Sequence, residues 1–139
     1  MARYKPAHVH QDMTNWCAYA CICSVMELNG SSCDQWKLND EIRPKDNAPS
    51  GAEIIKYFED RDYEVYKSLC RTIRSIEQRA EDGWRIIVLL EELRHAVVYW
   101  KCEHDLVYVM DPACTTMRSI EKETFEKDKK CCVFVRHEE

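Results

Sequence analysis

Residues 11–26 are QDMTNWCAYACICSVM, and they contain the first regular pattern of the chain. From here on, apolar residues recur at the spacing of one helix face, at Cys17, Ala20, Cys21, Val25 and Leu28. Asn15 is a residue type that caps helices, and Asn29 and Gly30 are types that end them. The sequence therefore predicts a helix that begins near Trp16 or Cys17 and ends near Leu28.

Cys17 lies at the start of this predicted helix, where a thiol can become reactive. A cysteine attacks a carbonyl group well only as a thiolate, and its pKa falls at a helix N-terminus beside an imidazolium. The free backbone N–H groups of a helix start can also stabilise the oxyanion of a tetrahedral intermediate. Gln11, six residues earlier, has a side-chain amide that offers a second donor. These positions indicate an activated nucleophile.

A base for Cys17 has to come from another part of the chain, and His95 is the best placed histidine. Short apolar runs predict three antiparallel strands, at 85–90, 96–101 and 106–110. His95 stands directly before the second run, and Asp111 stands directly after the third. A hairpin brings the start of its first strand beside the end of its second, so His95 and Asp111 are expected to be neighbours. A carboxylate there would orient the imidazole and favour its charged form.

The other patterns predict helices mainly in the first half of the chain and strands mainly in the second. Ser50 and Glu53 form a capping box for a helix at 51–60, after a long connection at 31–49. Further elements are expected as a helical turn at 33–38, a strand at 63–69, helices at 72–81 and 121–127, and a strand at 131–135. This segregation predicts an α+β fold, in which an N-terminal helical part carrying Cys17 packs against a C-terminal antiparallel sheet.

Residues 11–26 resemble the nucleophile segment of papain-like cysteine peptidases, above all the bacteriocin-leader peptidases that precede ABC exporters. They also resemble stand-alone papain-like proteases that some bacteria deliver as effectors, whose segment tends to place a Gln before Asn-Trp-Cys. The second half is similar as well, with a His that opens an aliphatic strand, an Asp-Pro one hairpin later and a short acidic helix at 121–126. The resemblance extends over residues 9–134 and follows the family order of Cys, His and Asp.

The resemblance implies a papain-like fold and a peptidase that cleaves peptide bonds in a peptide or protein substrate. Cys17 would be the nucleophile, His95 the general base and acid, Asp111 the orienting carboxylate and Gln11 the oxyanion donor. No cofactor and no metal are implied. The chain differs from many relatives at Ala18, where they carry Gly or Trp directly after the cysteine.

Each of these residues also has a simpler explanation when it is taken alone. Cys17 could be a small buried hydrophobic residue, as free cysteines often are. Asp111 could end a strand before a turn, with Asp105 as the alternative carboxylate. Trp16 could form the floor of a substrate groove or pack against the first helix.

The remaining cysteines and histidines favour structural or solvated roles. Cys21 and Cys23 fall inside the predicted helix and are expected in the core. None of the other histidines begins an aliphatic strand: His8, His10, His104 and His137. A structural zinc site is disfavoured because the sequence contains no C-x2-C pair.

Length, charge and hydropathy limit the class of protein. The 139 residues are expected to form a single domain, 1–139. The net charge is −5 and the Lys and Arg residues are dispersed, which does not suggest a nucleic-acid partner. The longest aliphatic run, 86–90, is too short to span a membrane. The nine cysteines lack a repeated framework and no signal peptide precedes them, which indicates a cytoplasmic protein or export by a signal-less route.

Two other functions stay open at this point. The same Cys, His and Asp can support a deamidase or a transglutaminase-like acyl transfer. A catalytically silent module could keep the fold in order to hold a peptide. The substrate and the oligomeric state do not follow from the sequence.

Overall fold

The structure is a computed structural model that describes residues 4–69, 72–91, 94–128 and 130–137. Its helices are α1 (Cys17–Leu28), α2 (Gln35–Ile42), α3 (Gly51–Glu59), α4 (Ile73–Glu81) and α5 (Lys122–Lys127). Its strands are β1 (Tyr63–Ser68), β2 (Arg85–Leu90), β3 (His95–Glu103), β4 (Leu106–Met110), β5 (Arg118–Glu121) and β6 (Lys130–His137). Helices come first and strands dominate afterwards, as predicted.

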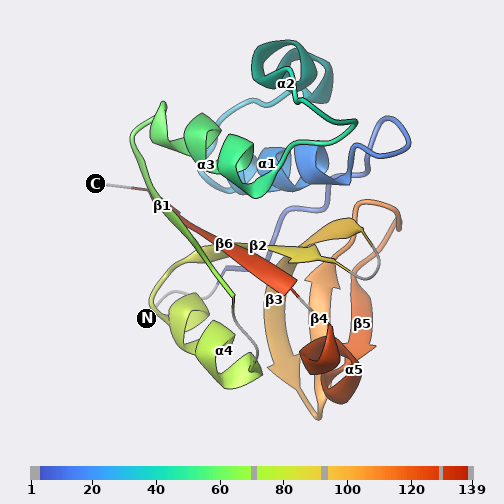
Figure 1. The fold of residues 1–139 in the computed structure, drawn as a ribbon. Coiled ribbons are helices and arrows are strands. Elements are labelled where there is room, and N and C mark those ends of the chain that lie inside the picture. The colour runs from blue at the N-terminus through green and yellow to red at the C-terminus, as the bar shows by residue number, and fades with distance from the viewer. Residues whose placement is uncertain (1–3, 70–71, 92–93, 129, 138–139) are drawn as a thin grey trace.

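The six strands form one antiparallel sheet in the order β1-β6-β2-β3-β4-β5. Strands β2 to β5 follow one another as neighbours, whereas β6 lies between β1 and β2 (Figure 1). The pairing of β3 with β4 has an irregularity between Tyr99 and Lys101, and Val98 pairs with Met110 beyond it. This hairpin brings the start of β3 close to the residues that follow β4.

Helices cover both faces of the sheet. Side chains alternate along a strand, so Ile87 of β2 packs with α1 and α3, while Ile86 and Val88 pack with α4 and α5. Figure 1 shows α1, α2 and α3 gathered on one side of the sheet and α4 and α5 on the other. The α+β fold with a helical part on an antiparallel sheet is therefore confirmed, and the second helical layer is a finding of the structure.

The start of α3 confirms the predicted capping box. The Ser50 backbone N–H donates to Oε1 of Glu53 over 2.9 Å, and the Glu53 backbone N–H donates to Oγ of Ser50 over 3.2 Å. Two orphan donors of the helix start are satisfied in this way, which fixes the point at which α3 begins.

Strand β5 was not predicted from the sequence. Arg118–Glu121 has only four residues, three of which are exposed at the edge of the sheet. It lacks the apolar run that marks a buried strand, so its pairing with β4 comes from tertiary context.

Within the described ranges, no helix has the length and apolar character needed to cross a membrane.

Candidate active site

The first helix begins at Cys17, but its cap differs from the predicted one. Asn15 has a φ of 72°, in the left-handed region, and Trp16 is the N-cap residue. The Trp16 side chain makes no capping hydrogen bond. The expectation that Asn15 caps α1 was therefore wrong, because the turn at Met13–Trp16 carries Asn15 away from the capping position. The N-cap side chain therefore satisfies none of the first backbone N–H groups of α1.

The Cys17 sulfur lies within hydrogen-bonding reach of the His95 ring and of two backbone N–H groups, those of Ala18 and Ala96. Burial of the thiol raises its pKa, and these hydrogen bonds lower it by more, so the pKa of Cys17 falls below its ordinary value. The surroundings of Cys17 thus favour the thiolate form.

His95 connects Cys17 with Asp111. Its Nε2 lies 2.5 Å from Oδ1 of Asp111, which leaves Nδ1 for the Cys17 sulfur. The hydrogen bond with Asp111, followed by the one with Cys17, raises the pKa of His95 to about 9 although burial opposes the charge. At neutral pH the imidazole is therefore protonated, and it faces a sulfur that favours negative charge.

Asp111 is buried directly after β4 and is held by three donors. Besides His95, the backbone N–H of Ala113 donates to Oδ1 over 2.9 Å, and Nη1 of Arg118 donates to Oδ2 over 2.9 Å. Burial raises the pKa of Asp111, but the hydrogen bond with His95 and these two donors hold it well below its usual range. Arg118 lies on β5, the strand that the sequence did not reveal, and nothing in its sequence context pointed to this role.

The backbone of Gln11 lies next to the loop that contains Asp111. The Gln11 N–H donates to the carbonyl of Pro112 over 3.0 Å, and its Nε2 donates to the carbonyl of Met13 over 3.3 Å. The same Met13 carbonyl accepts the N–H of Trp16, which places the Gln11 amide beside the turn that enters α1. Among the described residues, Oε1 of Gln11 is buried without a hydrogen-bond partner.

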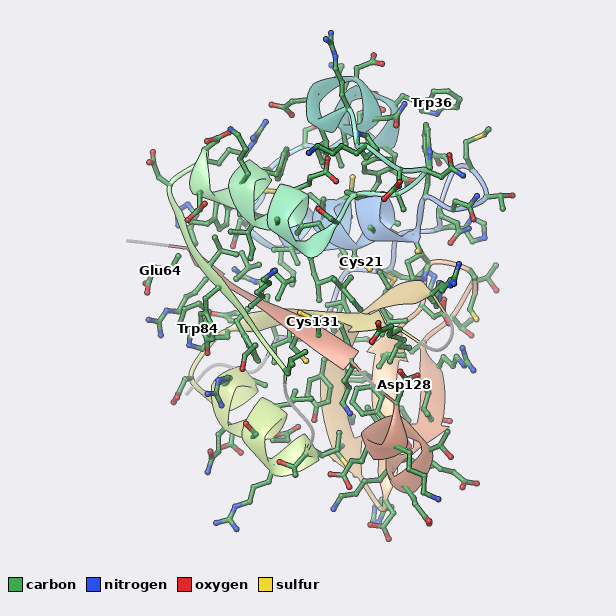
Figure 2. All side chains as sticks on the ribbon, viewed as in Figure 1. Cys21, Trp36, Glu64, Trp84, Asp128 and Cys131 are labelled. Atoms are coloured by element: carbon green, nitrogen blue, oxygen red, sulfur yellow. The ribbon has the colours of Figure 1, made fainter. Side chains whose placement is uncertain are left out.

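Trp16 lies in the core at the start of α1. Its ring packs edge-on against Tyr19 at 5.3 Å and against Trp36 at 4.6 Å between ring centroids. Trp36 lies beside α2 and is mostly exposed (Figure 2). The place of Trp16 in a substrate groove stays a prediction.

A cavity of about 610 Å³ opens in front of Cys17 and His95. Gly51 at the start of α3 and Pro49 before it line one side, and the sheet contributes apolar residues such as Leu89. Leu69, which is 74% exposed, also lines it, as does Cys131 of β6, which is labelled in Figure 2. Gln11 and Trp16 are not among the lining residues. The cavity is largely apolar and has the two reactive side chains at its wall.

The other cysteines of α1 are buried in the core, as predicted. Burial raises the pKa of Cys21 well above its ordinary value, and the nearby Cys17 and Asp111 add to this. A hydrogen bond with Cys33 and burial raise the pKa of Cys23. Both side chains therefore stay neutral thiols. They differ in this from Cys17 on the same helix, whose pKa is lowered.

The other described histidines have different surroundings. The His8 ring bonds to the carbonyl of Cys114 over 2.7 Å, His104 lies in the β3–β4 turn, and His137 packs against Tyr63 at the end of β6. In the part of the chain that the structure describes, no three His, Cys, Asp or Glu side chains gather as metal ligands would.

Comparisons with known proteins agree with this geometry. Residues 5–135 match the model of the peptidase C39 family. A search of curated proteins finds no match.

Three solved structures share the fold at low identity. The peptidase domain of Streptococcus ComA, a bifunctional ABC transporter of a quorum-sensing pathway, has a TM-score of 0.78 and 17% identity over 94% of this chain and 97% of that one.

The second is a double glycine motif protease from an AMS/PCAT transporter in complex with the leader peptide. Its TM-score is 0.82 and its identity 14%, over 99% of this chain and 95% of that one. The third is a putative C39-like peptidase from Bacillus anthracis, with a TM-score of 0.74 and 12% identity over 97% and 96% of the two chains. These likenesses confirm the papain-like fold. Because the family model spans nearly the whole chain, this protein belongs to the peptidase C39 family of papain-like cysteine peptidases.

Proposed function

We propose that Cys17, His95 and Asp111 together hydrolyse peptide bonds, with Gln11 as an oxyanion donor. The observation that carries the proposal is that the Cys17 sulfur lies within hydrogen-bonding reach of the His95 ring, whose Nε2 bonds to Oδ1 of Asp111. It joins a nucleophile, a proton carrier and an orienting carboxylate in the order that acyl transfer requires.

The reaction would proceed in two stages. The Cys17 thiolate attacks the carbonyl carbon of the scissile bond, and the negative charge moves onto the carbonyl oxygen. The proposed donors for this oxyanion are the backbone N–H groups at the start of α1 and the Gln11 amide, whose Nε2 also donates to the Met13 carbonyl. His95 then gives its proton to the leaving amine. In the second stage His95 takes a proton from water, and the hydroxide releases the acyl group from Cys17.

The cavity beside Cys17 supports a peptide or protein substrate. Its apolar wall, with Leu69, Leu89 and Pro49, suits hydrophobic side chains of an extended chain segment. One structure of the same fold is a double glycine motif protease that holds the leader peptide. We propose that the substrate of this protein binds in the corresponding cavity, and that Trp16, which does not line the cavity, supports it through its packing at the start of α1.

At pH 6 we expect Cys17 to react with iodoacetamide at least about tenfold faster than Cys102. An ordinary thiol with a pKa near 8.5 is only about 0.3% thiolate at this pH. The pKa of Cys102 is raised by burial, whereas that of Cys17 is lowered, so Cys17 keeps a much larger reactive fraction. Mass spectrometry of the labelled peptides measures both rates in one sample. Equal labelling of Cys17 and Cys102 would contradict the proposal and favour a catalytically silent peptide-binding module.

Replacing Asp111 by Asn is expected to lower the rate of peptide hydrolysis about 10²- to 10³-fold and to narrow its pH range. The hydrogen bond with Asp111 is the main cause that keeps His95 protonated up to about pH 9. Without the carboxylate the pKa of His95 falls toward its ordinary value near 6.5, so activity should decline above about pH 7 rather than above about pH 9.

The pH–rate profiles of the two proteins, measured from pH 5 to pH 10, test this prediction. Asp105→Asn is the matched control, because Asp105 is the exposed carboxylate at the other end of the same hairpin. Unchanged profiles for both variants would remove Asp111 from the proposed mechanism.

A further inference from the structure

We propose that Gln35 is a positioning residue that holds Gln11 in place for catalysis. The proposal rests on the proposed function, in which Gln11 is an oxyanion donor. Gln35 belongs to α2 and acts on Gln11 through the backbone on either side of it.

Gln35 is buried although it belongs to a short polar helix. It is the first residue of α2 and is 5% exposed, whereas the next residue, Trp36, is 55% exposed. Asp34 already caps the helix by accepting the N–H of Trp36 over 2.9 Å, so the Gln35 amide is free for another task. Burial of an amide is unfavourable unless it is hydrogen-bonded, so its partners indicate where Gln35 acts.

Both ends of the Gln35 amide bond to the segment that carries Gln11. Oε1 accepts the backbone N–H of Asp12 over 2.9 Å, and Nε2 donates to the backbone carbonyl of His10 over 2.9 Å. One side chain thus holds the residue before Gln11 and the residue after it. This segment lies outside every helix and strand, so the two bonds replace the support that regular structure would provide.

A third bond holds Gln11 from the opposite direction. Its backbone N–H donates to the carbonyl of Pro112, the residue after Asp111. The segment is therefore fixed between α2 and the loop that contains Asp111, with the Gln11 amide beside the turn into α1. Without Gln35 one of these two anchors is lost, and a shift of about 1 Å in a catalytic group can lower a rate about 10²-fold.

Two small reagents separate the placement of Gln11 from the state of Cys17. With p-nitrophenyl acetate, the Cys17 thiolate attacks the acetyl carbon through an oxyanion, a thioester forms and p-nitrophenolate leaves. With iodoacetamide, the same sulfur displaces iodide and no oxyanion forms. Rates measured with the Cys17→Ala protein are subtracted to remove the contribution of the other cysteines.

Gln35→Met keeps a side chain of similar size and removes both hydrogen bonds. We expect it to lower the rate with the ester at least about tenfold and to change the rate with iodoacetamide by less than about twofold. Gln11→Ala should lower the rate with the ester about 10²-fold. Adding Gln35→Met to Gln11→Ala should cause no further loss, because Gln35 acts through Gln11.

Two more variants separate the positioning of Gln11 from a general folding defect in the Gln35→Met protein. Gln35→Glu keeps the bond to Asp12 and loses the bond to His10, so it should also slow the ester reaction selectively. Asn39→Ala is the matched control on the same helix. It removes the acceptor of the Tyr19 hydroxyl, a hydrogen bond of 2.8 Å between α1 and α2, and leaves residues 10–12 untouched. It should change neither rate by more than about twofold.

Three results would overturn the role of Gln35 while leaving Gln11 in the mechanism. They are an unchanged ester rate in both Gln35 variants, an equal loss with both reagents, and a further loss when Gln35→Met is added to Gln11→Ala. A Gln11→Ala protein with the full ester rate would instead remove Gln11 from the proposed function, and the role of Gln35 with it.

Discussion

Cys17→Ala is expected to lower the rate of peptide hydrolysis by at least about 10⁴-fold. The methyl group of Ala cannot form an acyl-enzyme, so only binding and oxyanion stabilisation would remain, and loss of the nucleophile in related mechanisms has effects of this size or larger. The measurement is the appearance of new N-termini in a peptide mixture, read by mass spectrometry. Ammonia is followed in the same samples, because its release without new N-termini would indicate deamidation or acyl transfer.

Cys102→Ala is the matched control for this variant. Cys102 lies on β3 near the end opposite His95, so its loss removes one thiol without reaching the proposed site. We expect its activity to stay within about twofold of the unmodified protein. If Cys17→Ala retained more than about a tenth of the activity, Cys17 could not be the nucleophile.

His95→Ala is expected to lower the rate of hydrolysis about 10³- to 10⁴-fold, and to slow alkylation of Cys17 at pH 6. The variant loses the group that protonates the leaving amine. It also removes the largest of the effects that lower the pKa of Cys17, while the burial that raises this pKa remains. The two measurements, hydrolysis and alkylation, should therefore fall together.

The control for His95 is His104→Ala, in the turn that joins β3 to β4. His104 is exposed, and its replacement should leave hydrolysis and alkylation unchanged. A His95→Ala protein in which Cys17 is still alkylated rapidly at pH 6 would show that the backbone N–H groups of Ala18 and Ala96 are sufficient to activate the thiol.

The helices and most strands could be predicted because their patterns are local. The capping box at Ser50 and the helical spacing after Cys17 need no tertiary information. The neighbouring positions of His95 and Asp111 could also be predicted, since a hairpin with a short turn leaves little freedom of pairing. Their roles in the reaction remain predictions.

Other features depend on contacts that sequence patterns do not encode. Strand β5 exists because Arg118–Glu121 pairs with β4, and its polar residues give no sign of this. Arg118 could not be assigned to Asp111 for the same reason. Gln35 is a polar residue in a polar helix, and only the path of residues 10–12 across α2 makes it a buried amide. The prediction that Asn15 caps α1 was wrong because the backbone of Asn15 adopts a left-handed conformation, and the preference of Asn for N-cap positions does not account for that.

The place of β6 in the sheet affects how the protein folds during synthesis. Residues 130–137 form the strand that lies between β1 and β2, although they follow all the other described strands in the sequence. Until they leave the ribosome, the edges of β1 and β2 have no partner, and contacts over long sequence separations form slowly. While the residues between β2 and β6 are translated, the nascent chain therefore exposes two strand edges that lack their partner, and chaperones that shield such edges would have their largest effect before β6 emerges.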